Sequence, residues 1–245
     1  MMKSIRVRTG LTAAMLLLAA SGAHAASNNG GISLSGTRLI FDGSNDAASM
    51  TVTNSAASDV WLMRFWVSAY GDKADAKANM PFAVTPPLYR LDPQNAVQLR
   101  VNKLSDSLPA DRESVFYLNN LAIPPKKGEK SYQKAVQSGL QFAVNTRIKL
   151  FYRPGAISDA DAVKAAPGKL TLSMSGASMT LKNPTPYFIT LSQLAVNGKT
   201  VQTTGDSMVS PFGSVTVAAG SPHGTFTYST VDDRGMTVAA APRTF

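Results

Sequence analysis

The sequence predicts an all-β protein built from two antiparallel sandwich domains. Apolar residues recur at every second position over much of the chain, and helical spacing is hard to find. The alternating runs are short and are separated by Pro, Gly, Asn and Asp, as in sandwich folds. Strand patterning stops after residues 153–155 and resumes at residue 169, so the 245 residues divide into two units of ordinary domain size.

The first domain is placed at residues 26–154. Its expected strands are the alternating runs at residues 49–53, 60–70, 96–101, 114–118 and 140–152. The second run follows the turn-forming sequence NSAASD and the third follows DPQN, which are the residue types that end strands.

The second domain is placed at residues 159–245, after a stretch rich in Ala and Asp. Its expected strands are residues 169–174, 187–191, 214–217 and 225–228. Asn197 and Gly198 form the dipeptide typical of a tight β-hairpin turn.

The first 25 residues have the pattern of a secretory signal. Lys3, Arg6 and Arg8 precede an apolar run that is too short to span a bilayer, and Ala23-His24-Ala25 provides a small-x-small cleavage site. We expect residues 1–25 to be cleaved off. The three cations are then lost from the mature chain, whereas the full sequence has a formal net charge of +9. The chain is therefore expected to be exported.

The composition excludes several classes of function. There are no cysteines, so disulfides, thiolate zinc sites and cysteine nucleophiles are absent. His223 is the one histidine left after cleavage, and it lies in a turn-like stretch, so a catalytic triad or a histidine zinc site is poorly supported. The sequence contains no basic stripe interleaved with aromatics, so nucleic-acid binding is poorly supported. Residues 198–200 resemble the end of a phosphate-binding loop, but Gln193 stands where the first glycine should be and the context is strand–turn–strand, where such a loop opens a helix. We predict no enzyme activity, metal or cofactor.

The run at residues 140–152 is the most unusual feature of the sequence. It alternates over a length of roughly 43 Å at ~3.3 Å per residue, far beyond a common strand. Two interpretations remain open at this point. The run is either a long central strand with bent ends, or a strand whose first half is an edge that a partner must cover, because an exposed apolar edge promotes aggregation.

Five short motifs in order carry a resemblance to a known family. They are TRLIF at 37–41, TPP at 85–87, LPADRES at 108–114, IKLFYRP at 148–154 and NPTPY at 183–187. Together they resemble the periplasmic pilus chaperones of the chaperone–usher pathway over essentially the whole mature chain. The resemblance implies two immunoglobulin-like β-sandwich domains at an angle, with a cleft between them and no catalysis, nucleotide or metal.

The resemblance also implies a client-binding site. Pilin (fimbrial) subunits would be bound in the periplasm, stabilised by donation of the long strand, and delivered to an outer-membrane usher. Leu140, Phe142 and Val144 would insert into the subunit's incomplete core. Arg38 and Lys149 would hold the subunit's terminal carboxylate. Without the motifs, these two cations would simply be an edge-strand charge and a solvated lysine.

A second implied group is structural. Glu113, Arg153 and Asp233 match positions that form a salt-bridge network between the two domains in this family. As exposed pairs they would each contribute only about 0–1 kcal/mol, so their value depends on burial.

Some features leave alternatives open. The loop at residues 126–139 is longer than in the family's compact members but lacks the cysteine pair of its long-loop branch, so the branch stays open. A client-free chaperone could cover its edge by self-association. A structural subunit or adhesin of a surface fibre is the alternative function, although the polar, Gly-rich residues 26–31 do not resemble a donor extension.

Overall fold

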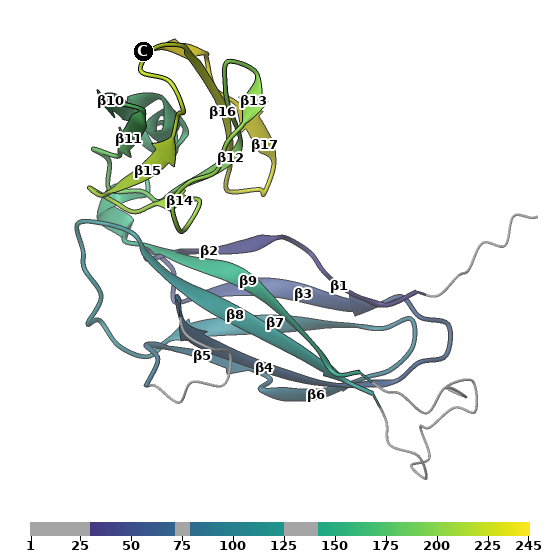
Figure 1. The fold of residues 1–245 in the computed structure, drawn as a ribbon. Coiled ribbons are helices and arrows are strands. Elements are labelled where there is room, and N and C mark those ends of the chain that lie inside the picture. Colours follow the sequence, from purple (N-terminus) through teal and green to yellow (C-terminus); the bar gives the residue numbers. More distant parts are fainter. Residues whose placement is uncertain (1–29, 72–78, 125–141) are drawn as a thin grey trace, which may run out of the picture.

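The computed structural model describes residues 30–71, 79–124 and 142–245. The expected signal segment at residues 1–25, the loop at 126–139 and Leu140 lie outside the described residues. The described part consists of two β-sandwich domains joined by a short helical connection (Figure 1). The prediction of an all-β, two-domain fold is confirmed.

The N-terminal domain contains two facing sheets. One has the strand order β1-β3-β7-β5, and the other has the order β2-β9-β8-β4-β6. The strands are β1 (Ile32–Leu34), β2 (Arg38–Asp42), β3 (Ala47–Asn54), β4 (Trp61–Ala69), β5 (Phe82–Thr85), β6 (Leu88–Leu91), β7 (Ala96–Lys103), β8 (Ser114–Ile123) and β9 (Val144–Arg153).

The core of this domain lies between its two sheets and follows the period-two pattern of the sequence. In β7, Val97, Leu99 and Val101 point inward while their neighbours are exposed or half-buried. Phe41 and Leu150, from neighbouring strands of the second sheet, are completely buried against them. Each fully buried side chain of this size contributes about 1.5–3 kcal/mol, so the alternation fixes which face of each strand is internal.

β9 begins later than the sequence pattern predicts. The expected strand covered residues 140–152, whereas the ladder starts at Val144. Its antiparallel partner β8 ends at Ile123, and Pro124, which follows, has no N–H to donate. Phe142 therefore lies just outside the strand, because β8 has ended there and provides no backbone hydrogen bonds beside it.

The connection between the domains contains a short helix that the sequence pattern did not predict. A 3-10 turn at Gly155–Ile157 leads into α1 (Ala160–Ala165), and a second 3-10 turn spans Ala166–Lys169. The Asp159 carboxylate caps α1 by accepting a 2.7 Å hydrogen bond from the N–H of Ala162.

The C-terminal domain is a second sandwich. One sheet has the order β10-β11-β15, and the other has β13-β12-β16-β17, with β14 paired to β12 and β18 to β16. Its strands are β10 (Thr171–Ser175), β11 (Ser178–Lys182), β12 (Ile189–Val196), β13 (Lys199–Thr200), β14 (Met208–Val209), β15 (Ser214–Ala218), β16 (Thr225–Val231), β17 (Thr237–Ala239) and β18 (Arg243–Thr244). The predicted Asn197-Gly198 hairpin turn is confirmed, with both residues at positive φ between β12 and β13.

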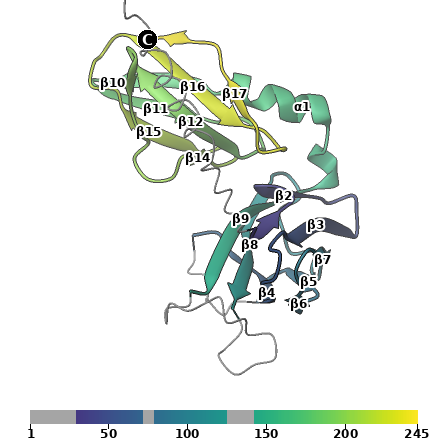
Figure 2. The same ribbon diagram turned by 90° about the vertical axis from the view of Figure 1, so that its right-hand side faces the viewer.

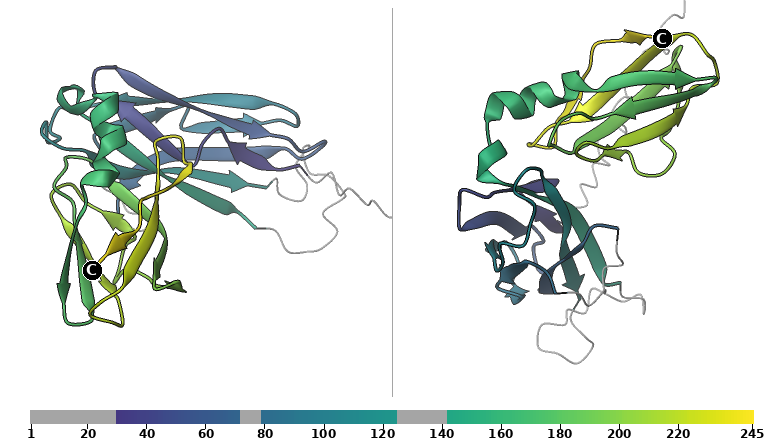
Figure 3. Two further views of the ribbon diagram at one scale, coloured as in Figure 1. Left: turned by 90° about the horizontal axis from the view of Figure 1, so that it is seen from above. Right: turned by 90° about the vertical axis from the view of Figure 1, so that its left-hand side faces the viewer.

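The two domains meet at an angle. The C-terminal domain stands over one end of the N-terminal sandwich, next to the end of β9 and the start of β2 (Figures 1 and 2). Views along the other axes show the long direction of the N-terminal sandwich extending away from this junction (Figure 3). Residues of β2, β9 and the end of β4 are thereby brought beside loops of the C-terminal domain.

Candidate functional site: an open strand edge and a cation pair

β9 has two neighbouring strands along only part of its length. On one side β8 pairs with its residues 144–152. On the other side β2 pairs in parallel with residues 149–153 only, near the C-terminal domain (Figure 1). Within the part of the chain that the structure describes, no strand pairs with this second side over residues 144–148. We call it the open edge, and its main-chain groups can accept one more strand.

The apolar side chains at the free end of β9 are exposed. Phe142 is 66% exposed and Val144 is 55% exposed, although both are large apolar residues. Further along the same face, Ile148 and Leu150 are buried in the domain core. This largely apolar face, with Thr146 between Val144 and Ile148, thus begins outside the domain and ends inside it. That favours the edge interpretation over that of a central strand.

Arg38 and Lys149 lie side by side where the open edge ends. They are register partners in the parallel pairing of β2 with β9, and we call them the cation pair. Nη1 of Arg38 donates a 3.2 Å hydrogen bond to the carbonyl oxygen of Val231 in the C-terminal domain. Its Nε is buried and has no hydrogen-bond partner among the described residues. The guanidinium also lies 5.6 Å from the ring centroid of Phe151.

Lys149 is half-buried at the domain junction. Its Nζ lies 3.6 Å from Sδ of Met208, a weak acceptor, and 5.6 Å from the ring centroid of Tyr70. Among the described residues neither cation of the pair forms an ion pair within 4.0 Å. Burial lowers the pKa of Lys149; Asp206 opposes this and Arg38 adds to it.

The pKa of Arg38 is shifted in the same direction as that of Lys149, and for the same main cause. Burial lowers its pKa, and attraction to Asp233, Asp232 and Glu113 opposes the shift. Two partly desolvated cations with unused donors form a binding site for a small anion, above all a carboxylate, which can accept from both. The chemistry of the cation pair is therefore suited to an anion at the inner end of the open edge.

The three residues expected to link the domains are brought together. Nε of Arg153 donates to Oε1 of Glu113 at 2.8 Å, and its two terminal nitrogens donate to the Asp233 carboxylate at 2.8 and 3.0 Å. The other Glu113 oxygen accepts a 2.7 Å bond from the N–H of Phe188, and the Glu113 N–H donates to the carbonyl of Pro186. We call Glu113, Arg153 and Asp233 the domain brace.

Burial makes the brace more important than an exposed pair. Glu113 is 4% exposed and Arg153 is 8% exposed, so both are largely removed from water. Burial raises the pKa of Glu113, while Arg153 and the Phe188 amide lower it in part. Burial alone would lower the pKa of Arg153, but its bonds to Asp233 and Glu113 raise it above the usual value. Glu113 and Arg153 therefore depend on each other for solvation, whereas the Asp233 side chain stays 42% exposed.

Tyr70, Asp206 and Met208 also surround Lys149, and sequence reasoning missed them. Tyr70 follows β4, whereas the other two lie in and just before β14. They are far apart in the chain and carry no motif, so no signal in the single sequence could have placed them together.

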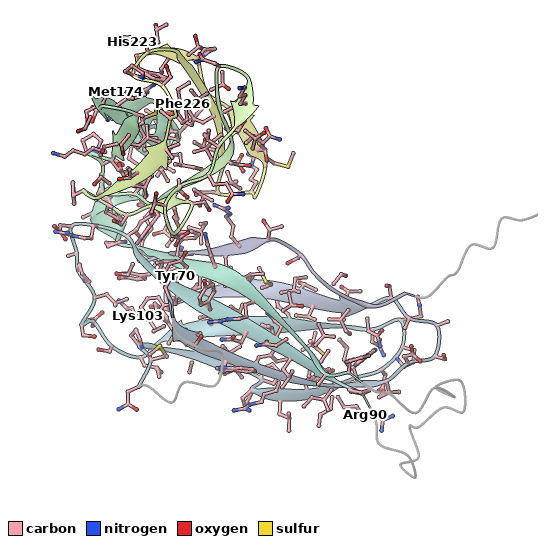
Figure 4. The ribbon with its side chains drawn as sticks, in the orientation of Figure 1. Tyr70, Arg90, Lys103, Met174, His223 and Phe226 are labelled. Carbon is pink, nitrogen blue, oxygen red and sulfur yellow. The ribbon has the colours of Figure 1, made fainter. Side chains whose placement is uncertain are left out.

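The described residues do not support a catalytic or metal site elsewhere in the molecule. His223 lies in an exposed turn at the outer end of the C-terminal domain, far from Tyr70 at the junction (Figure 4). In residues 30–71, 79–124 and 142–245, no group of His, Cys, Asp or Glu is arranged to hold a metal ion. Over the same residues, no helix is long and apolar enough to cross a membrane.

Two family models match the two domains in order. Residues 31–158 match the pili and flagellar-assembly chaperone PapD N-terminal domain, and residues 165–241 match the pili assembly chaperone PapD C-terminal domain. The chain belongs to this family of pilus-assembly chaperones. The resemblance seen in the five sequence motifs is thereby confirmed, and family membership favours a chaperone over a structural subunit or adhesin.

Individual pilus chaperones are similar over most of their length. The probable fimbrial chaperone LpfB of Escherichia coli O157:H7 is 39% identical over 209 residues, which cover 84% of this chain and 85% of LpfB. The crystal structure of the periplasmic chaperone SfaE superposes with a TM-score of 0.69 at 32% identity, covering 87% of this chain and 98% of SfaE. A Salmonella enterica structure of SafA pilin in complex with the SafB chaperone matches with a TM-score of 0.69 at 28% identity, covering 87% and 95%.

Proposed function

We propose that this pilus chaperone binds pilin subunits in the periplasm by donating β9 to them, and delivers them to an outer-membrane usher. The observation that carries the proposal is the continuity of the open edge with the cation pair. The edge offers main-chain hydrogen bonds and exposed apolar side chains, and the pair offers a fixed point for one end of the client strand. The similarity to SafB, which is bound to a pilin, supports the same assignment.

In this mechanism the client's missing strand is supplied from outside. The client strand pairs with the open edge over residues 144–148, and its incomplete core receives Phe142 and Val144, with Leu140 expected to continue the series. Covering these side chains removes apolar surface from water in both proteins. Apolar burial thus stabilises the complex, while the main-chain ladder aligns the two strands.

The cation pair fixes the register of that ladder. A strand can slide by two residues and still present the same face, so register needs a separate determinant. A terminal carboxylate held by Arg38 and Lys149 ends the client strand at one position. The binding of a carboxylate also compensates the two cations for the solvation that they lost on folding.

The domain brace has a structural role in the proposal. It holds the C-terminal domain so that Val231 and Met208 stay beside the cation pair. We place the two domains at residues 26–154 and 159–245, after removal of residues 1–25. In this role the protein binds, delivers and releases subunits and carries out no chemical reaction.

Co-expression tests the proposal. The exported protein is produced together with a pilin-type subunit from the same genome and purified under native conditions. We expect a one-to-one complex with the wild-type protein and none with Lys149→Ala. A chaperone that purifies alone with every such subunit would contradict the proposal.

A further inference from the structure

Tyr70 lies between the client-binding lysine and an acidic residue of the other domain. Its ring faces Nζ of Lys149, and its hydroxyl donates a hydrogen bond to Oδ2 of Asp206. The ring is held in place by Tyr117, whose ring centroid lies 5.0 Å away. A tyrosine hydroxyl is protonated at neutral pH and can donate, and burial and the bond to Asp206 raise the pKa of Tyr70 further.

The presence of Asp206 here is unexpected for a site that binds a carboxylate. Its negative charge acts on Lys149 and partly offsets the lowering of the lysine's pKa by burial, yet the two do not form an ion pair. The other Asp206 oxygen accepts a 3.1 Å bond from the N–H of Met208, so the carboxylate is tethered from two sides. An incoming client carboxylate would meet the same lysine and be repelled by Asp206.

We propose that Asp206 is an internal competitor for the client's terminal carboxylate, and that Tyr70 keeps Asp206 away from Lys149. This inference rests on the proposed function and deepens it. Tyr70 acts as a positioning residue, because its hydroxyl satisfies the Asp206 carboxylate and leaves Lys149 without an ion-pair partner among the described residues. Asp206 weakens the hold on the client and so speeds its release.

Two conservative substitutions distinguish the proposed role of Tyr70 and Asp206 from the alternative that their hydrogen bond only joins the two domains. Tyr70→Phe keeps the ring over Lys149 but frees Asp206, which can then pair with the lysine, so we expect client affinity to fall about two- to fivefold. Asp206→Asn removes the competing charge, so we expect affinity to rise by a similar factor, mainly through slower dissociation. In Tyr70→Phe/Asp206→Asn the loss should disappear, because no carboxylate remains to occupy Lys149. A mere link between domains would give both single variants the same sign.

The test uses a synthetic peptide with the sequence of the C-terminal strand of a pilin-type subunit from the same genome. Calorimetry compares its free carboxylate and its C-terminal amide, and both effects should appear with the carboxylate alone and shrink in high salt. Asp161→Asn on α1 makes the same charge change elsewhere and should leave affinity unchanged. If neither peptide form binds the wild-type protein, the proposed function fails and the inference with it. If the carboxylate form binds better than the amide but the two variants change affinity in the same direction or not at all, only the inference is overturned.

Discussion

Arg38 and Lys149 are register partners of β2 and β9, at the point where β9 loses its second neighbouring strand. The parallel pairing places both side chains on one face, beside the C-terminal domain. An extended client that adds to the open edge therefore runs directly into two cations. This geometry gives the site a direction, because only the end of the client strand that carries the negative charge fits at the pair.

Removal of either cation should weaken client binding without unfolding the chaperone. We expect Arg38→Ala and Lys149→Ala each to cost about 2–5 kcal/mol of binding free energy, because the client carboxylate loses a donor and stays partly desolvated. Calorimetric titration with a purified pilin-type client measures the loss, and melting temperatures check the fold. Lys199→Ala, which removes an exposed cation of β13, is the matched control. Unchanged affinity in both site variants would rule out the anchor role.

Client binding and chaperone stability should respond to alkaline pH in opposite directions. Burial lowers the pKa of Lys149 below that of an ordinary lysine, about 10.4. As the pH rises through this lowered pKa, the ammonium that holds the carboxylate is lost and affinity falls. Over the same window the unfolded chain binds more protons than the folded one, so the Lys149 contribution to the free energy of unfolding rises.

Lys149→Arg provides the comparison for the pH experiment. Arginine stays charged throughout the accessible range, so this variant should keep its affinity to higher pH than the wild-type protein. Affinities measured by titration at several pH values decide the point. Identical pH profiles for the two proteins would show that Lys149 is not the titrating group.

Within the domain brace, the buried carboxylate should matter far more than the exposed one. Glu113→Ala leaves Nε of Arg153 and the N–H of Phe188 without their partner, and we expect a loss of about 3–5 kcal/mol. The Asp233 side chain is 42% exposed, so Asp233→Ala should cost no more than about 1 kcal/mol. Urea unfolding followed by tryptophan fluorescence compares the variants. Glu113→Gln keeps an acceptor and should fall between them, whereas equal losses for Glu113→Ala and Asp233→Ala would contradict the role assigned to burial.

Parts of the structure could be predicted from the sequence because they depend on repeated or local patterns. Period-two alternation locates long strands such as β4 and β7, and Asn197-Gly198 locates a turn. Strands of two residues, such as β13 and β14, are too short for any periodicity to detect. The start of β9 depends on where its partner strand stops, which alternation within β9 cannot reveal.

The candidate site also contains residues that the sequence could predict and residues that it could not. Arg38, Lys149, Glu113 and Arg153 lie in motifs that the resemblance rests on, so they could be named in advance. Asp233 lies outside these motifs and was named from the resemblance alone. Tyr70 and Asp206 come from different domains and meet only because the interdomain angle brings them together. A contact of this kind depends on tertiary structure, and a single sequence contains no local pattern that predicts it.

Phe142 offers the sharpest test of strand donation, because its side chain is largely free of contacts with its own domain. Phe142→Asp should abolish client capture, since a charge would have to enter the client's apolar core, and the chaperone's own melting temperature should not change. Leu104 is the matched control: it is 66% exposed, as Phe142 is, but it follows β7 instead of the open edge. Leu104→Asp should therefore leave capture intact in a co-purification assay. Equal loss of capture in both variants would point to a general effect of surface charge, and normal capture by Phe142→Asp would show that this face of β9 does not enter the client.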